Sequence, residues 1–298
     1  MSIYKKYTDY IHTFIDSDIE EWTFKSNPNY VYMLEHVSGQ QGAEYLNEIY
    51  NRFNSFYTQN KNYLIELCSI NDLYGKTNKI TYTNFTTCSP TNLRYILHSL
   101  LILSYINECK LNNVDNIDNM DNMDNMDNMD NMDNMDNMDN MDNMDNMDNM
   151  DNIDIIEIGG GYGGLCFYVN KLAKLFNITI NTYTIFDLQE PLLLQKKYLE
   201  KLNINTMTTI NYYDVNNINH IQNLKLNSFL ISTYAFSEIP LELQKEYTNK
   251  VLNVYVSYGF IAWNNIDVYN FIENKNITSE REFPLTGNKN YYVKFRPL

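Results

Sequence analysis

Cysteine is scarce in this sequence, and the spacing of the few that occur excludes several roles. The 298 residues include four cysteines, and no two of them form a Cys-x-x-Cys pair. They lie in apolar or helical stretches, so we expect reduced core residues of an intracellular protein, with neither disulfides nor a metal site. These cysteines are Cys68, Cys88, Cys109 and Cys166.

Basic residues are fewer than acidic ones, and long apolar runs are absent. The chain has 22 Lys and Arg against 37 Asp and Glu, and the basic residues form no run. Nucleic acid is therefore not an expected partner, because its binding requires a basic patch. No apolar run approaches the roughly 20 residues of a membrane helix, and the first residues lack the apolar core of a signal peptide. We expect a cytoplasmic protein without a membrane partner.

A repeat of Asp-Asn-Met from about Asp115 to Asn152 divides the chain. It contains 13 aspartates and so accounts for most of the formal net charge of −15. A period of three matches neither a helix nor a strand, and this composition offers no continuous apolar stripe to bury. The low-complexity segment 115–152 is therefore predicted to be a disordered linker. It separates a helical cap region, residues 1–114, from a domain at residues 153–298.

Both flanking regions carry clear periodicity. Ser89 and Pro90 start a helix whose apolar residues span 93–106, with a capping hydroxyl followed by proline at the first helical position. After the repeat, strands alternate with helices. The predicted strands are residues 153–158, 182–186, 208–212, 229–232 and 259–263, and the helices are 165–176, 191–202 and 241–254. This alternation predicts an α/β fold with a mostly parallel sheet, and residues 282–285 and 290–295 predict an antiparallel hairpin at its edge.

The most informative segment is the glycine cluster after the first of these strands. A β-branched run at 153–158 contains Glu157 and is followed by Gly159, Gly161 and Gly163 at alternate positions. Glycine there lets the chain turn sharply and bring bare backbone against a ligand. Gly159, Gly161 and Gly164 also satisfy the G-x-G-x-x-G fingerprint of dinucleotide-binding proteins. Glu157 favours a cofactor that carries an ammonium group, such as S-adenosylmethionine (SAM), over a pyrophosphate.

Polar side chains at the carboxyl ends of later strands are further candidates, because ligands of open α/β sheets bind at those ends. Asp187 is placed to accept hydrogen bonds from both ribose hydroxyls of an adenosine, and Asp214 suits the adenine amino group. Each aspartate also fits the N-cap of the helix that follows it. Asn264 and Asn265, after the fifth strand, suit the hydroxyls of a sugar substrate or simply form a turn.

Three blocks of the sequence resemble the sugar O-methyltransferase family of SAM-dependent enzymes. They are Ile-Ile-Glu-Ile-Gly-Gly-Gly-Tyr-Gly-Gly-Leu at 155–165, Tyr-Thr-Ile-Phe-Asp-Leu-Gln-Glu at 183–190 and Ser-Thr-Tyr-Ala-Phe-Ser-Glu-Ile at 232–239. The first two are also similar to plant-type small-molecule O-methyltransferases, which have proline where this chain has Gln189. The resemblance covers most of residues 153–265 and implies a Rossmann-like SAM-methyltransferase sheet.

The resemblance also implies roles for single residues. It places Gly159, Gly161 and Gly163 against the methionine part of SAM, and it places Asp187 on the ribose. The chain is accordingly expected to be a SAM-dependent O-methyltransferase that transfers a methyl group to a hydroxyl of a sugar or glycoconjugate. Its expected partner is a small-molecule or glycan acceptor.

The identity of the general base is left open by the sequence. Glu238 lies just beyond the fourth strand, where an acceptor would bind, but it would also suit a solvated carboxylate at a helix start. His220 is the second catalytic candidate and the one histidine of the α/β half. Two other interpretations of the whole chain stay open: an NAD(P)-dependent oxidoreductase that uses the glycine turn, and a non-catalytic binding protein with a methyltransferase fold.

Overall fold

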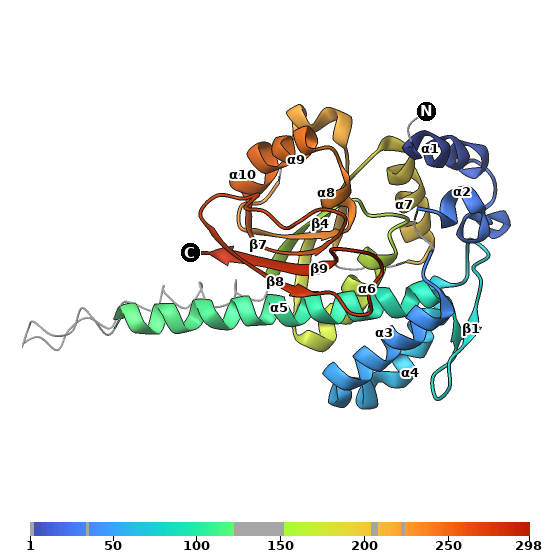
Figure 1. Cartoon of the computed structure of the whole chain (residues 1–298), viewed down its shortest axis with the longest axis horizontal. Coiled ribbons are helices and arrows are strands. Elements are labelled where there is room, and N and C mark those ends of the chain that lie inside the picture. Colours follow the sequence, from blue (N-terminus) through green and yellow to red (C-terminus); the bar gives the residue numbers. More distant parts are fainter. Residues whose placement is uncertain (1–2, 34–35, 122–151, 204–207, 222–223) are drawn as a thin grey trace, which may run out of the picture.

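The computed structural model describes residues 3–33, 36–121, 152–203, 208–221 and 224–298. It shows a helical N-terminal region packed beside an α/β sheet, with the long helix α5 (Pro90–Asp121) running along the sheet (Figure 1). Most of the predicted linker, residues 122–151, lies outside the described residues. Helix α5 continues beyond the boundary predicted at residue 114 and enters the first repeats.

The N-terminal region is mainly helical, as the sequence predicted. Local caps explain where its helices begin: Ser38 and Gln41 form a capping box at the start of α3, and Ser89 Oγ accepts a hydrogen bond of 3.2 Å from the backbone N–H of Thr91. The short hairpin formed by residues 80–81 and 87–88 was not predicted. Besides α5, the elements are α1 (Ile3–Phe14), η1 (Ile19–Glu21), η2 (Phe24–Ser26), α2 (Pro28–Val31), α3 (Gly39–Arg52), α4 (Asn54–Asn71), β1 (Ile80–Thr81) and β2 (Thr87–Cys88).

A seven-stranded sheet with the order β5-β4-β3-β6-β7-β9-β8 forms the second half of the chain. Its strands are β3 (Asn152–Ile158), β4 (Thr179–Asp187), β5 (Thr209–Asp214), β6 (Ser228–Thr233), β7 (Val256–Trp263), β8 (Lys275–Arg281) and β9 (Tyr291–Pro297). Strands β3 to β7 are parallel, and β9 runs antiparallel to both of its neighbours. The order of the parallel strands is that of a Rossmann-like doubly wound sheet, which confirms the predicted fold class.

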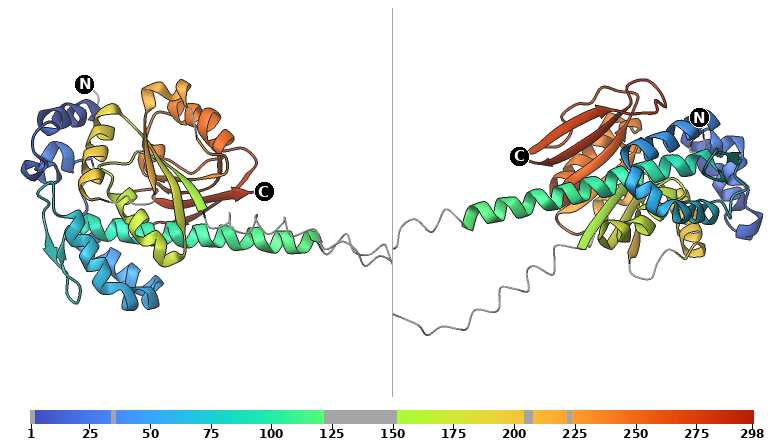
Figure 2. Two further views of the ribbon diagram at one scale, coloured as in Figure 1. Left: turned by 180° about the vertical axis from the view of Figure 1, so that it is seen from behind. Right: turned by 90° about the horizontal axis from the view of Figure 1, so that it is seen from below.

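Helices cover both faces of this sheet (Figure 2). Successive residues of β3 explain why: Ile155 points into one apolar cluster, whereas Ile156 and Ile158 point into the other. The cluster around Ile155 also contains residues of the N-terminal region, so the two halves share one core. One face is covered by α5, α6 (Gly164–Ala173), η4 (Lys174–Phe176) and α7 (Gln189–Lys201), and the other by α8 (Ala235–Glu238), α9 (Leu241–Tyr247), η6 (Thr248–Leu252) and α10 (Asn253–Tyr255).

The first arm of the predicted C-terminal hairpin was wrong. The strand that pairs with β9 is β8, and residues 282–290 form a loop instead of a strand and a tight turn. Strand β8 lies at the edge of the sheet and is mostly exposed, so no apolar alternation marks it in the sequence. The predicted arm contains Pro284, which cannot donate a ladder hydrogen bond.

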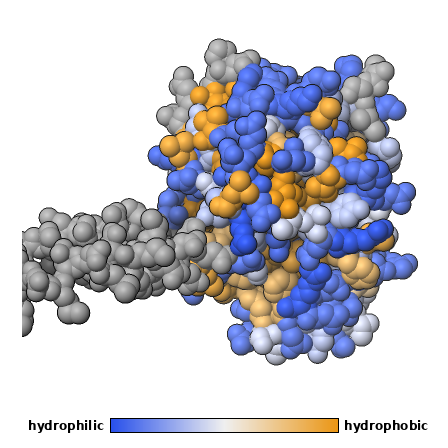
Figure 3. Space-filling model, turned by 60° about the vertical axis from the view of Figure 1, so that its left-hand side comes forward, coloured by the Kyte–Doolittle hydropathy of each residue, from blue (hydrophilic) through white to orange (hydrophobic). Residues whose placement is uncertain are grey.

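The surface is mainly hydrophilic on the face that Figure 3 shows, with apolar patches between the polar side chains. In the part of the chain that the structure describes, no helix is both long and apolar enough to cross a membrane. All four cysteines are buried, which confirms their predicted place in the core.

A buried lysine joins the N-terminal region to the glycine turn. Lys25 is 2% exposed, and its ammonium lies 4.4 Å from the ring centroid of Tyr162 and 4.8 Å from that of Tyr198, within the range of cation–π attraction. The ammonium also donates hydrogen bonds to the Tyr198 hydroxyl, at 2.7 Å, and to the Asn71 carbonyl. Because Tyr162 belongs to the glycine turn and Tyr198 to α7, this one side chain connects three segments.

Lys25→Met should therefore destabilise the fold. The change keeps the apolar stem but removes a donor from two buried acceptors, so we expect the free energy of unfolding to fall by about 1–3 kcal/mol. Urea denaturation measures the loss, and Lys196→Met, at an exposed position of α7, is the matched control. Equal stability of the Lys25 variant and the parent would show that the lysine does not fasten these segments.

Candidate functional site

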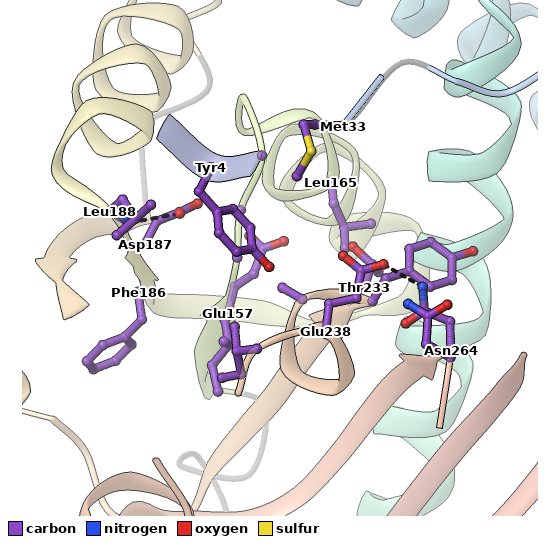
Figure 4. A pocket seen from close by; sticks show the side chains of 18 of the residues that line it. Tyr4, Met33, Glu157, Leu165, Phe186, Asp187, Leu188, Thr233, Glu238 and Asn264 are labelled. Atoms are coloured by element: carbon purple, nitrogen blue, oxygen red, sulfur yellow. Dashed lines mark hydrogen bonds between the residues drawn. The ribbon is translucent and has the colours of Figure 1, made fainter. Parts of the chain in front are cut away.

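A cavity of about 470 Å³ opens at the carboxyl ends of β3, β4 and β6. Its wall combines the glycine turn with the residues that follow β4, β6 and β7. Tyr4 and Met33 of the N-terminal region and the loop 286–290 complete it (Figure 4). The cavity therefore lies where an open α/β sheet binds its ligands.

The glycine turn presents bare backbone to this cavity. Gly159 and Gly161 line it, as predicted, and have φ of +76° and +59°, values that favour glycine. A Cβ on Gly159 would come within 2.1 Å of the Ala235 side chain, so the close approach also excludes a larger residue. Gly163 instead is the N-cap residue of α6 and faces α7, and it is not among the described residues that line the cavity. Gly160 lines it in addition and was not singled out from the sequence.

Glu157 contributes a buried carboxyl to the cavity wall. The residue is 0% exposed, its Oε2 accepts a hydrogen bond of 3.0 Å from the Tyr183 hydroxyl, and its Oε1 has no partner among the described residues. Burial raises the pKa of this carboxyl to about 8, although the bond from Tyr183 acts in the opposite direction. A buried carboxyl with one unsatisfied oxygen is suited to a ligand that brings a cation or a hydrogen-bond donor.

Asp187 lies at the end of β4 on the same wall. Its Oδ1 accepts from the backbone N–H of Leu188 and its Oδ2 from the side-chain amide of Gln195, both at 2.8 Å. Burial raises the pKa of Asp187 to about 6, against the lowering effect of these bonds and of the N–H groups of Gly160 and Gly161. The structure therefore brings a carboxylate to the place where the sequence predicted a ribose contact, and that contact stays a prediction.

Glu238 and Asn264 form a pair at the other end of the cavity. The Asn264 amide donates to Glu238 Oε1 at 2.5 Å, and the hydroxyl of Ser237 donates to Asn264 Oδ1 at 2.7 Å. Both members of the pair line the cavity, as does Asn265. Figure 4 shows them across the cavity from Asp187. Three predicted residues from two separate segments are thus brought together.

Two other predicted residues are not brought to the wall. Asp214 caps η5 (Val215–His220), because its Oδ1 accepts from the Asn216 N–H at 2.9 Å. It is not among the described lining residues, and its neighbour Val215 lines the cavity instead. The contact of Asp214 with adenine stays a prediction. The side chain of His220 lies outside the described part, so its catalytic role is untested.

One polar group on the cavity wall was not predicted from the sequence. Tyr234, directly after β6, has a φ of +70°, which is uncommon for a residue with a side chain. Its hydroxyl donates to the buried carboxylate of Glu282, whose other oxygen accepts from the Asn290 amide at 2.7 Å. Burial raises the pKa of Glu282. Tyr234 and Asn290 line the cavity, and no spacing in the sequence connects them.

Carboxyl groups, amides and hydroxyls, together with backbone amides and the guanidinium of Arg94, therefore supply the chemistry of the cavity. Among the described residues, no group of three His, Cys, Asp or Glu side chains could hold a metal ion. The end at the glycine turn offers carboxyls to a ligand with donor groups. The end at Glu238 offers a carboxylate and amides to a polar partner.

No protein-family model and no curated protein matches this chain. Solved structures are similar over about half of it. An rRNA methylase from Streptococcus thermophilus is 12% identical, with a TM-score of 0.36 over 50% of this chain and 88% of that one. An O-methyltransferase family protein from Burkholderia thailandensis is 8% identical, with a TM-score of 0.37 over 49% of this chain and 51% of that one. TrmK from M. capricolum, solved with S-adenosyl-homocysteine, is 17% identical, with a TM-score of 0.33 over 49% and 62%.

Glu157→Gln should change how stability depends on pH. The carboxyl has a pKa of about 8 in the folded protein and about 4.3 when unfolded. Folding therefore favours its protonated form. This contribution is fully present below pH ~4 and is lost as the pH rises through 8, by up to about 1.4 kcal/mol per pH unit.

Urea unfolding between pH 6 and 8.5 measures this loss, which the Gln variant should lack. Asp187, whose pKa burial raises to about 6, also loses its proton at the lower end of this window, and the parent and both variants share that contribution. Glu242→Gln, at an exposed position of α9, is the control and should keep the slope of the parent. If the parent and Glu157→Gln showed the same slope, the unusual pKa of Glu157 would be refuted.

Proposed function

We propose that this chain is a SAM-dependent O-methyltransferase that acts on a hydroxyl of a sugar or glycoconjugate. The observation that supports it most is the buried carboxyl of Glu157, with one oxygen unsatisfied, beside a turn of bare glycine backbone. An ammonium group satisfies such a carboxyl, whereas a pyrophosphate would place like charges together. The resemblance of residues 155–165, 183–190 and 232–239 to sugar O-methyltransferases agrees with this choice.

The residues at the glycine turn fit SAM group by group. Glu157 would hold the ammonium, the backbone of residues 159–161 would lie against the methionine part, and Asp187 would accept from the ribose hydroxyls. Leu188 and Val215 offer apolar surface to an adenine ring. When bound, SAM supplies an electrophilic methyl group on a sulfonium centre.

At the other end, the side chains suit an acceptor hydroxyl. Asn264 donates to one oxygen of Glu238, and an ionised carboxylate has further capacity to accept the proton of a hydroxyl. The pairing also fixes the orientation of the carboxylate, which in-line transfer requires. Asn265, Thr286 and Asn290 add amide and hydroxyl groups to this part of the wall, a set that suits the several hydroxyls of a sugar.

The experiment that tests the cofactor is a calorimetric titration of the purified protein with SAM and, separately, with NAD(P)H. We expect SAM to bind and NAD(P)H not to bind. Gly161→Val should abolish SAM binding, because a branched side chain would occupy the place where backbone meets cofactor. Circular dichroism checks that the variant is folded. A folded Gly161→Val protein with parental SAM affinity would refute this site, and binding of NAD(P)H alone would favour the oxidoreductase.

The role of Glu238 is tested by Glu238→Gln. Loss of a general base lowers turnover by about 10²-fold or more, while SAM affinity should stay at the parental value because Glu238 lies at the acceptor end. Methyl transfer from labelled SAM to a panel of sugars measures turnover, and Glu242→Gln is the control. Parental turnover in Glu238→Gln would remove this residue from the mechanism, and His220 would be tested next.

A further inference from the structure

Gln195 lies behind the glycine turn, in the middle of α7, and is fully buried. Its side-chain amide donates one hydrogen bond of 2.8 Å to Oδ2 of Asp187 and another of 3.0 Å to the backbone carbonyl of Gly161. One side chain therefore links the carboxylate at the end of β4 to the turn that follows β3.

The orientation of this amide is fixed by its partners. Both are acceptors, so only the NH₂ group can satisfy them, and a flipped amide would set oxygen against oxygen. Gln195 Oε1 has no partner among the described residues. The turn also packs closely on the amide: a Cβ on Gly160 would lie 3.1 Å from Gln195 Nε2. The side chain of Gln195 is thus held by contacts with both the glycine turn and the end of β4.

We propose that Gln195 is a positioning residue of the cofactor site, which holds the carboxylate of Asp187 against the glycine turn in the arrangement that receives an adenosine. This inference rests on the function proposed above. It goes beyond that function because it assigns a role to a side chain that is not among the described residues lining the cavity.

The amide also affects the charge of Asp187. Burial raises the pKa of that carboxyl to about 6, and the bond from Gln195 is one of those that oppose the rise. Among the described residues, the titratable groups that face Asp187 are Glu157 from β3, Tyr7 from α1 and Tyr247 from α9, and Asp214 is its neighbour in register on β5. Burial raises the pKa of both tyrosines, so they stay neutral below pH 9.

Removing the amide donor should therefore raise the pKa of Asp187 further. Ribose hydroxyls donate to the ionised carboxylate more strongly than to the neutral acid. The affinity for an adenosine should accordingly rise as the pH passes through the pKa of Asp187 and then level off. If Gln195 only filled space behind the turn, replacing it would leave the midpoint of this pH dependence unchanged.

The experiment measures the dissociation constant of 5′-methylthioadenosine from pH 5 to pH 9. This probe keeps the adenosine but has no amino-acid group, so Glu157 has no ammonium to meet. The parent should show a midpoint near the pKa of about 6. Gln195→Met, which keeps the length of the side chain without a donor, should raise the midpoint by about one pH unit or more. It should also weaken binding at pH 6 about fivefold, because the ionised fraction of Asp187 falls from about 1/2 to about 1/11.

The matched control is Gln244→Met. Gln244 is also buried, and its amide donates to the Ile239 carbonyl at 2.8 Å without a hydrogen bond to Asp187. The control should lose stability and keep the parental midpoint. Gln195→Glu has the size of glutamine, places a second carboxyl beside Asp187 and should raise the midpoint further. If Gln195→Met does not fold, Gln195→Leu, which is also apolar and has no donor, decides the question in its place.

The outcomes separate the two proposals. A parent that binds neither SAM nor the probe would overturn the proposed function, and the role of Gln195 with it. A parent that binds both, with an unchanged midpoint in the folded Gln195 variant, would overturn the role of Gln195 alone. A raised midpoint in that variant and a parental one in Gln244→Met would support it.

Discussion

The chain has to turn from β3 into α6 within a few residues and leave its backbone bare toward a ligand, and the rest of the site is arranged around that turn. On the side of the turn that faces the cavity, the positive φ of Gly159 and Gly161 allows the sharp change of direction. On the outer side, Lys25 packs on Tyr162 of the turn, and Gln195 donates to the Gly161 carbonyl. The N-terminal region and α7 therefore both determine the shape of the cavity.

Two buried acids give this cavity its chemical character. Burial raises the pKa of Glu157 to about 8 and that of Asp187 to about 6, because it disfavours the ionised form of each carboxyl. A ligand that brings a cation or hydrogen-bond donors would stabilise the ionised forms. SAM brings an ammonium group, which would meet the unpartnered Oε1 of Glu157, and two ribose hydroxyls, which would donate to Asp187. Opposite them, the Glu238 and Asn264 pair presents an acceptor and a donor to a polar substrate.

The sequence predicted the parallel strands and the glycine turn because apolar periodicity and glycine both act locally. It could not predict β8, because a polar edge strand carries no periodic signal. It left Asp214 with two roles, since an aspartate after a strand serves a cap as well as a ligand, and its contact with Asn216 shows the cap. Gln195 carried a weak signal as a polar residue on the apolar face of α7, but its partners become visible only in the folded chain.

Proton release on SAM binding tests most directly whether Glu157 receives the ammonium. At pH 7 a carboxyl with a pKa of about 8 is mostly protonated in the free protein, and pairing with a cation should ionise it. Calorimetry in two buffers of different ionisation enthalpy should therefore show release of about 0.9 proton per SAM bound by the parent, and almost none by Glu157→Gln. Tight SAM binding with no proton release from the parent would contradict the assignment of Glu157.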